Sequence, residues 1–219
     1  MDENIVIQLE RQKAVTATFR RLDSAKKEKI YRAALEAFSK EVYDRVSLDE
    51  IAASAEISKG SLIQYFANKE NLLRFVIKIF LDDYGGFWEK YFSGEIAVRA
   101  RERIVSFYLA ATELWDKDKI SLRFYIKMRY ENDAILTQEY REKILRIQSE
   151  HLNNMIMRGM ETGELRRDIE GEVIVQILLG VMRNIELACL PAFQTARGKA
   201  SLKEQTEKMA ATLFDGIKG

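Results

Sequence analysis

The scarcity of chain breakers is the strongest constraint on the fold of this sequence. One proline and eleven glycines are spread over 219 residues, too few for the many tight turns of an all-β sandwich or barrel. Hydrophobic residues make up 47% of the chain and charged residues 32%, which is enough apolar material for a packed core and too much for intrinsic disorder. We therefore expect an all-α globular protein with one large domain or two small ones.

The features that bear on location favour a cytoplasmic protein. The N-terminal segment opens with acidic residues and lacks the basic start and long apolar centre of a secretory signal. The most apolar stretch, from Val173 to Leu190, is interrupted by charged residues such as Arg183 and Glu186, so we expect no transmembrane span. The single cysteine, Cys189, leaves no partner for an internal disulfide, and no Cys/His cluster offers a zinc site. We expect no metal and no cofactor.

Three helices are predicted near the N-terminus. Residues 24 to about 40 place apolar side chains on one stripe at helical spacing, with Ser24 as the capping residue. Ser47 and Glu50 have the spacing of a capping box for a second helix. This helix has only about two turns, because Ser58 caps a third one soon afterwards.

The rest of the chain also has helical spacing. Asn68 caps a fourth helix, and the pair Gly85-Gly86 interrupts it, since each glycine in a helix interior costs roughly 1 kcal/mol relative to alanine. A kink or hinge is expected there. Residues 1–22 form either a flexible arm or an extra helix packed on a partner, and their sequence does not decide between the two. The later helices are expected at about 96–116, 119–131, 133–161, 169–190 and 201–217.

Two very short helices joined by a tight turn are typical of a helix-turn-helix. The segments that begin at Ser47 and Ser58 are too short to be stable alone, and Ala52 offers the small side chain that a close crossing needs. In this motif the first helix crosses the phosphate backbone and the second enters the major groove of DNA. The alternative on spacing alone is an ordinary helical corner in a bundle.

The segment from Ile30 to Leu73 resembles the DNA-binding domain of the TetR family of transcriptional regulators. Its string IYRAALEAFSKEVYDRVSLDEIAASAEISKGSLIQYFANKENLL carries the family's features in order, over about the first third of the chain. Val42 and Glu56 stand where the family commonly has glycine, and Ile63 where it commonly has tyrosine. If Glu56 adopts the left-handed conformation, the backbone strain is about 1 to 2 kcal/mol.

The resemblance implies a set of DNA-binding residues. In the major groove, Gln64 suits adenine, Lys59 suits guanine, and Ile63 suits a thymine methyl. The amide end of the second helix and the side chains of two further residues would hold phosphates, although Tyr65 has the alternative of an ordinary core position. The expected residues are Ser47, Lys59, Gly60, Ser61, Ile63, Gln64, Tyr65 and Lys69.

The resemblance further implies a helical ligand-binding and dimerisation domain after the DNA-binding domain. The expected division is an N-terminal extension at 1–22, a DNA-binding domain at 23–84 with its helix-turn-helix at about 47–66, and an effector-binding and dimerisation domain at 85–219. The last two helices are apolar enough to form a homodimer interface. Candidates for a hydrophobic or aromatic effector, which could equally be plain core, are Trp88, Phe107, Trp115, Phe124, Tyr125, Met128 and Met155.

The sequence therefore predicts a ligand-responsive DNA-binding regulator, a repressor released from a pseudo-palindromic operator by a small hydrophobic effector. The alternatives are an all-α enzyme and a helical protein-interaction module. An enzyme is disfavoured because no HExxH or Glu-x-x-His motif is present and His151 is the only histidine. We interpret His151 as a surface or partly buried residue. An interaction module would lack the steep salt dependence of phosphate contacts.

Overall fold

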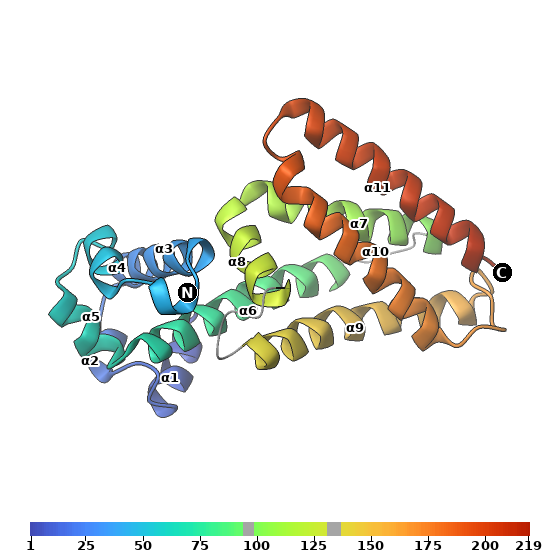
Figure 1. The fold of residues 1–219 in the computed structure, drawn as a ribbon. Coiled ribbons are helices and arrows are strands. Elements are labelled where there is room, and N and C mark those ends of the chain that lie inside the picture. Colours follow the sequence, from blue (N-terminus) through green and yellow to red (C-terminus); the bar gives the residue numbers. More distant parts are fainter. Residues whose placement is uncertain (94–98, 131–136) are drawn as a thin grey trace. The chain divides into compact units, whose positions relative to one another are not determined.

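The computed structural model describes residues 1–93, 99–130 and 137–219 (Figure 1). Within these residues the regular structure is helical, apart from an isolated β-bridge between Leu165 and Lys218. The all-α prediction is confirmed. The elements are α1 (Glu3–Arg11), α2 (Ala17–Arg20), α3 (Ser24–Lys40), the 3₁₀ turn η1 (Tyr43–Arg45), α4 (Leu48–Ser54), α5 (Lys59–Phe66), α6 (Lys69–Ser93), α7 (Ala100–Lys117), α8 (Lys119–Tyr130), α9 (Thr137–Glu161), α10 (Gly171–Ala192) and α11 (Ala196–Ile217).

The described chain divides into two compact units. The first unit contains residues 1–84 and 123–141, and the second contains 85–122 and 142–219. The helices α6, α8 and α9 each contribute residues to both units. The assignment of DNA binding to 23–84 and of effector binding to 85–219 stays a prediction.

Side-chain caps mark the starts of α3, α4 and α5. Ser47 accepts from the Glu50 amide at 3.4 Å at the start of α4, and Ser58 accepts from the Ser61 amide at 3.0 Å at the start of α5. One cap is corrected. The N-cap of α3 is Asp23 and not Ser24, because the Asp23 carboxylate accepts from the Lys26 amide at 2.8 Å. Ser24 is the first residue of the helix itself.

The predicted interruption at Gly85-Gly86 is wrong, since α6 continues through both glycines. A Cβ at Gly85 would lie 3.7 Å from Ile147, and a Cβ at Gly86 would meet nothing within 4 Å. The intrinsic cost of the two glycines is about 1 kcal/mol each. Burial of the neighbouring Tyr84 and Trp88 offsets it, because burying a large apolar side chain stabilises by about 1.5 to 3 kcal/mol.

The N-terminal residues 1–22 form α1 and α2, which pack on the first unit of this same chain. Phe19 is completely buried, with its ring centroid 4.9 Å from that of Phe66 and 5.0 Å from that of Phe75. The Thr16 amide donates to the Tyr65 carbonyl at 3.0 Å. These residues are therefore part of the first unit's core, and the flexible-arm alternative is wrong.

The second unit is a bundle in which α7, α10 and α11 pack on one another. Tyr108 on α7 donates its hydroxyl hydrogen to the Leu178 carbonyl of α10 at 2.9 Å. Gln148 on α9 donates to the buried Glu186 carboxylate of α10 at 3.2 Å. These buried polar contacts fix the register of α10 against its neighbours.

Among the described residues, α10 is the helix that is long and apolar enough to cross a membrane by length and composition. Its residues Leu178, Met182 and Ile185 are buried within the second unit, together with the carboxylate of Glu186. A buried core helix passes the same test, so the helix is weak evidence for a span.

Candidate nucleic-acid interface and cavity

The turn between α4 and α5 brings the two short helices into close contact. Ala52 on α4, Ala55 at the C-cap of α4 and Leu62 on α5 are each at most 2% exposed, so two small side chains lie against a leucine where the helices meet. The Ile57 amide donates to the Ala52 carbonyl at 3.0 Å and closes the turn. Glu56 has φ of +55°, which is the left-handed conformation expected if it replaces the family's glycine.

One face of α5 is exposed and carries the side chains predicted to enter the major groove. Ile63 is 43% exposed, although it is a large apolar residue in the middle of the helix. Lys59 and Gln64 are exposed beside it, and Ser61 is half-buried and bonded to the Ser58 hydroxyl at 2.9 Å. The structure therefore gathers these residues on one surface.

Two of the expected DNA contacts need no rearrangement of the core. Lys59 forms an ion pair with Asp49 at 2.7 Å. Both side chains are more than half exposed, and such a pair contributes about 0 to 1 kcal/mol, so the ammonium is available to a phosphate or a base. A Cβ at Gly60 would be 3.7 Å from the Ser58 hydroxyl, an ordinary contact, so none of the described residues requires glycine there.

Tyr65, the last of the expected contacts on α5, is a core aromatic in this structure. It is 6% exposed, and its ring packs edge-on to Phe19 with centroids 6.0 Å apart. This geometry favours the alternative that Tyr65 is a core residue. A contact between Tyr65 and a phosphate stays a prediction.

Lys69 holds the backbone that leads into α4. Its ammonium donates to the carbonyls of Tyr43, Asp44 and Val46 at 2.8, 3.1 and 3.2 Å, and it lies 4.7 Å from the centroid of the Tyr43 ring. All three N–H donors are thus used within the protein. Its phosphate contact stays a prediction, and its observed role is to position Ser47 at the start of α4.

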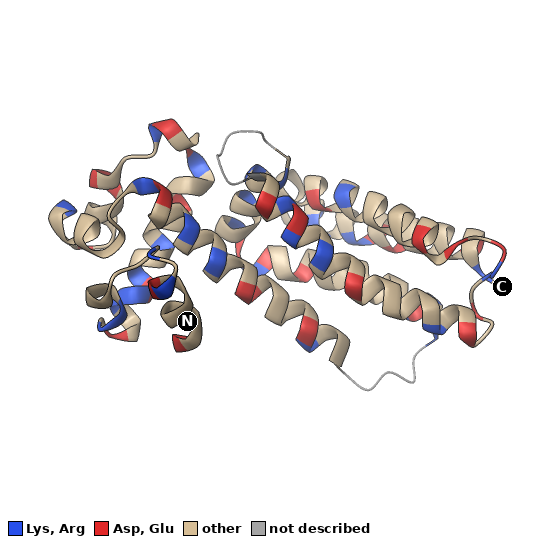
Figure 2. Cartoon of the chain, turned by 90° about the horizontal axis from the view of Figure 1, so that it is seen from below, with Lys and Arg blue, Asp and Glu red and all other residues tan. Residues whose placement is uncertain are grey.

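The N-terminal helices brace α5 from behind, a role that the sequence did not reveal. Thr16 donates through its hydroxyl to the Gln64 carbonyl at 3.0 Å, in addition to the amide bond to Tyr65. Asn71 on α6 donates to the Lys13 carbonyl at 3.1 Å. The last turn of α5 therefore has its carbonyls fixed by residues outside the helix-turn-helix. Figure 2 shows Lys and Arg interspersed with Asp and Glu along these helices.

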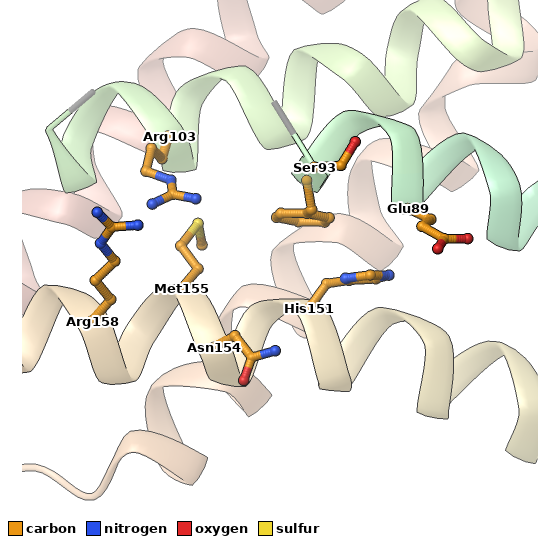
Figure 3. A pocket seen from close by; sticks show the side chains of 8 residues that line it. Glu89, Ser93, Arg103, His151, Asn154, Met155 and Arg158 are labelled. Carbon is orange, nitrogen blue, oxygen red and sulfur yellow. The ribbon is translucent and has the colours of Figure 1, made fainter. Parts of the chain in front are cut away.

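The second unit contains a cavity of about 350 Å³ between α6, α7 and α9 (Figure 3). Its floor is the buried Met155, and its rim carries exposed polar side chains. Among the described residues, no cluster of His, Cys, Asp and Glu is arranged to hold a metal ion. The lining residues are Glu89, Phe92, Ser93, Arg103, His151, Asn154, Met155 and Arg158.

The predicted effector residues are not brought together by this cavity. Only Met155 lines it. The side chains of Trp88, Phe107 and Trp115 are buried in the core of the second unit. The remaining three belong to the core of the first unit, and they are Phe124, Tyr125 and Met128.

His151 is half-buried, as expected, and it lines the cavity. Its ring stacks on Phe92, with centroids 4.7 Å apart and planes 10° apart. Burial lowers the pKa of His151 below its usual 6.5, and the nearby carboxylates of Glu150 and Glu89 partly oppose this shift. The imidazole is therefore neutral at physiological pH.

Comparison with known proteins supports the assignment of the first unit. Residues 30–76 match the family model described as bacterial regulatory proteins of the tetR family. These residues include α4, α5 and the turn between them. This segment is a tetR-type DNA-binding domain. A chain with this domain, similar to a regulator of fatty acid metabolism, is a DNA-binding regulator of transcription.

Similar proteins extend the likeness over most of the chain. It is 27% identical to the fatty acid metabolism regulator protein of Bacillus subtilis, over 70% of this chain and 77% of that protein. A TetR family regulator from Chloroflexus aurantiacus has the same fold, with a TM-score of 0.73 at 17% identity over 94% of this chain and 99% of the other. FadR from Bacillus subtilis in complex with stearoyl-CoA gives 0.68 at 18% identity, over 84% and 97%.

Proposed function

We propose that the chain represses transcription by inserting α5 into the major groove of a pseudo-palindromic operator, and that a small effector releases it. The observation that carries the proposal is the exposed face of α5. On this face Lys59 lies one helical turn before Ile63, and Gln64 follows Ile63 directly. The opposite face, with Leu62 and Phe66, is buried. A helix held in this way presents polar side chains and one apolar side chain to base edges.

A homodimer through α10 and α11 is the second part of the proposal. Val173, Ile177 and Leu187 are 45%, 44% and 40% exposed. At 100° per residue they lie within about 40° of one line along α10, and Gly180 lies on the same line. An exposed apolar stripe of this kind supports a subunit interface. A dimer would place two α5 helices on half-sites one DNA turn apart.

The relatives support an effector with a large apolar part. One is described as a fatty acid metabolism regulator and another was crystallised with stearoyl-CoA. For this chain we propose a hydrophobic or amphipathic effector that binds in the second unit. Because α6 contributes residues to both units, it is the candidate path by which occupancy alters DNA binding. Although α6 is continuous in this structure, we propose that it bends at Gly85 and Gly86 when the effector binds.

We infer a cytoplasmic location and no enzymatic activity, since the matched relatives are transcription regulators. A helical protein-interaction module would use the same short helices without phosphate contacts. Salt dependence distinguishes it, because each phosphate contact releases counterions.

The decisive experiment is fluorescence anisotropy of the purified chain with DNA from its own upstream region and with a scrambled duplex, at several salt concentrations. We expect tighter binding to the native duplex and affinity that falls steeply with salt. Lys59→Ala and Gln64→Ala should each weaken binding by roughly 5- to 150-fold, since a base contact contributes about 1 to 3 kcal/mol. The matched control is Lys40→Ala, which also removes an exposed lysine from an ion pair.

Two results would contradict the proposal. Equal loss in Lys40→Ala and Lys59→Ala would mean that α5 does not read the DNA. A salt-insensitive interaction would favour the protein-interaction module. For the dimer, Ile177→Glu should yield monomers in sedimentation velocity, while Leu145→Glu, an equally exposed apolar position on α9, should leave the oligomeric state unchanged.

A further inference from the structure

Two arginines converge on one end of the cavity in the second unit. Arg103 comes from α7 and Arg158 from α9, and Figure 3 shows their guanidinium groups turned toward each other beside Met155. Neither guanidinium has a hydrogen bond or an ion pair with any residue in the described part of the chain. Two cations that share a rim without an anion between them repel each other.

The electrostatics of Arg103 reflect this arrangement. Burial and the charge of Arg158 lower the pKa of Arg103, while Tyr91 and Glu164 partly oppose the shift. Glu164 supplies part of this compensation, but its carboxylate is engaged elsewhere. It accepts from the Ala100 amide at 2.7 Å and from the Thr162 hydroxyl at 3.3 Å. Among the residues that the structure describes, the arginine end of the cavity therefore has no carboxylate devoted to it.

The other end of the cavity has the opposite character. The stacked rings of Phe92 and His151 form an apolar wall, because the imidazole is neutral at physiological pH. Glu89 adds a negative charge at this end (Figure 3). His151 and Arg158 are seven residues apart on α9, which separates the two ends by about 10 Å along the helix.

We propose that this cavity binds an amphipathic organic anion about 10 Å long, with its acid group between Arg103 and Arg158 and its apolar body against Met155, Phe92 and His151. The ligand class rests on the proposed function, since it specifies the effector. The Glu89 carboxylate fixes the orientation by repelling the acid group from its own end. A carboxylate and a phosphate monoester share this chemistry, because both accept two hydrogen bonds from a guanidinium.

The test is isothermal titration calorimetry of the full-length chain, in the absence of DNA, with octanoate, octyl phosphate and octan-1-ol. These probes share one apolar chain and differ in the head group. We expect the acids to bind and the alcohol to bind at least tenfold more weakly. Arg103→Met and Arg158→Met should each weaken binding of the acids by about 10- to 100-fold, as expected for a hydrogen bond to a charged group, and should leave binding of the alcohol unchanged. Binding of octyl phosphate alone would assign a phosphate ester, and binding of octanoate alone a carboxylate.

The matched control is Arg101→Met, which removes an exposed arginine of α7 that does not line the cavity. The proposal is overturned if the alcohol binds as tightly as the acids or if Arg101→Met weakens binding as much as Arg103→Met. It is also overturned if no acid binds with Kd below about 1 mM, which corresponds to about 4 kcal/mol. This readout is independent of DNA, so arginine-dependent binding without any effect on operator affinity would refute effector release and leave the ligand class intact.

Discussion

Replacement of Ala67 by glycine should stabilise the protein. Ala67 connects α5 to α6 with φ of +62° and ψ of −42°, and the Asn68 amide donates to the Phe66 carbonyl at 2.7 Å across it. This is the positive-φ form of the γ-turn, which is rare and strained for a residue with a Cβ. Such a conformation costs on the order of 1 to 3 kcal/mol, and glycine removes most of it. Glycine also raises the entropy of the unfolded chain, which lowers the free energy of unfolding by about 0.5 to 1 kcal/mol.

The expected net gain from Ala67→Gly is about 0.5 to 2 kcal/mol in the free energy of unfolding, measured by urea unfolding with circular dichroism. Each kcal/mol should raise the Tm by about 2 to 4 °C for a chain of this size. The control is Ala53→Gly, an exposed alanine of α4 in the same unit with helical backbone. It should lower the stability by about 0.5 to 1 kcal/mol. If both variants lost stability equally, the inferred strain at Ala67 would be wrong.

Other substitutions and conditions test the remaining features. Lys69→Met should lower the free energy of unfolding by about 2 to 3 kcal/mol in urea unfolding, because three carbonyls lose a charged donor. The double change Gly85→Ala and Gly86→Ala fits without steric conflict, so it should raise the free energy of unfolding by about 1 to 2 kcal/mol. If the pair is the bending point, the variant should keep its DNA affinity, and the effector should release DNA less well in the anisotropy assay. Burial, with the charges of Glu186 and Asp116, raises the pKa of Cys189 to about 12, so iodoacetamide should modify it only after unfolding. His151 has a lowered pKa when folded, so the unfolded chain binds its proton first. Stability should therefore fall as the pH drops below about 6.5, and His151→Gln should reduce that slope in unfolding measured at several pH values.

The helix-turn-helix could be predicted from sequence because its signals are local. Ser47 and Ser58 mark helix starts by their own side chains, and each cap depends on a partner three residues away. The positive φ of Glu56 followed from the glycine that its family commonly has at the same position. Such features depend little on the rest of the fold.

The cavity could not be predicted in the same way. Arg103 and Arg158 are 55 positions apart in the sequence, and only the packing of α7 against α9 brings them to one rim. Apolar side chains such as Phe107 and Phe124 have the same helical spacing whether they line a pocket or fill a core. The continuity of α6 at Gly85 was missed for a related reason, since propensity alone does not include the burial of flanking residues.

The brace formed by α1 and α2 determines how small a working DNA-binding fragment can be. The family model begins at residue 30, yet Phe19 completes the aromatic cluster behind α5 and Thr16 engages its last carbonyls. A fragment cut at residue 30 would expose the ring of Phe66 to water and leave those carbonyls to solvent. A chimaeric regulator that uses this DNA-binding domain should therefore include the chain from about Glu3, where α1 starts.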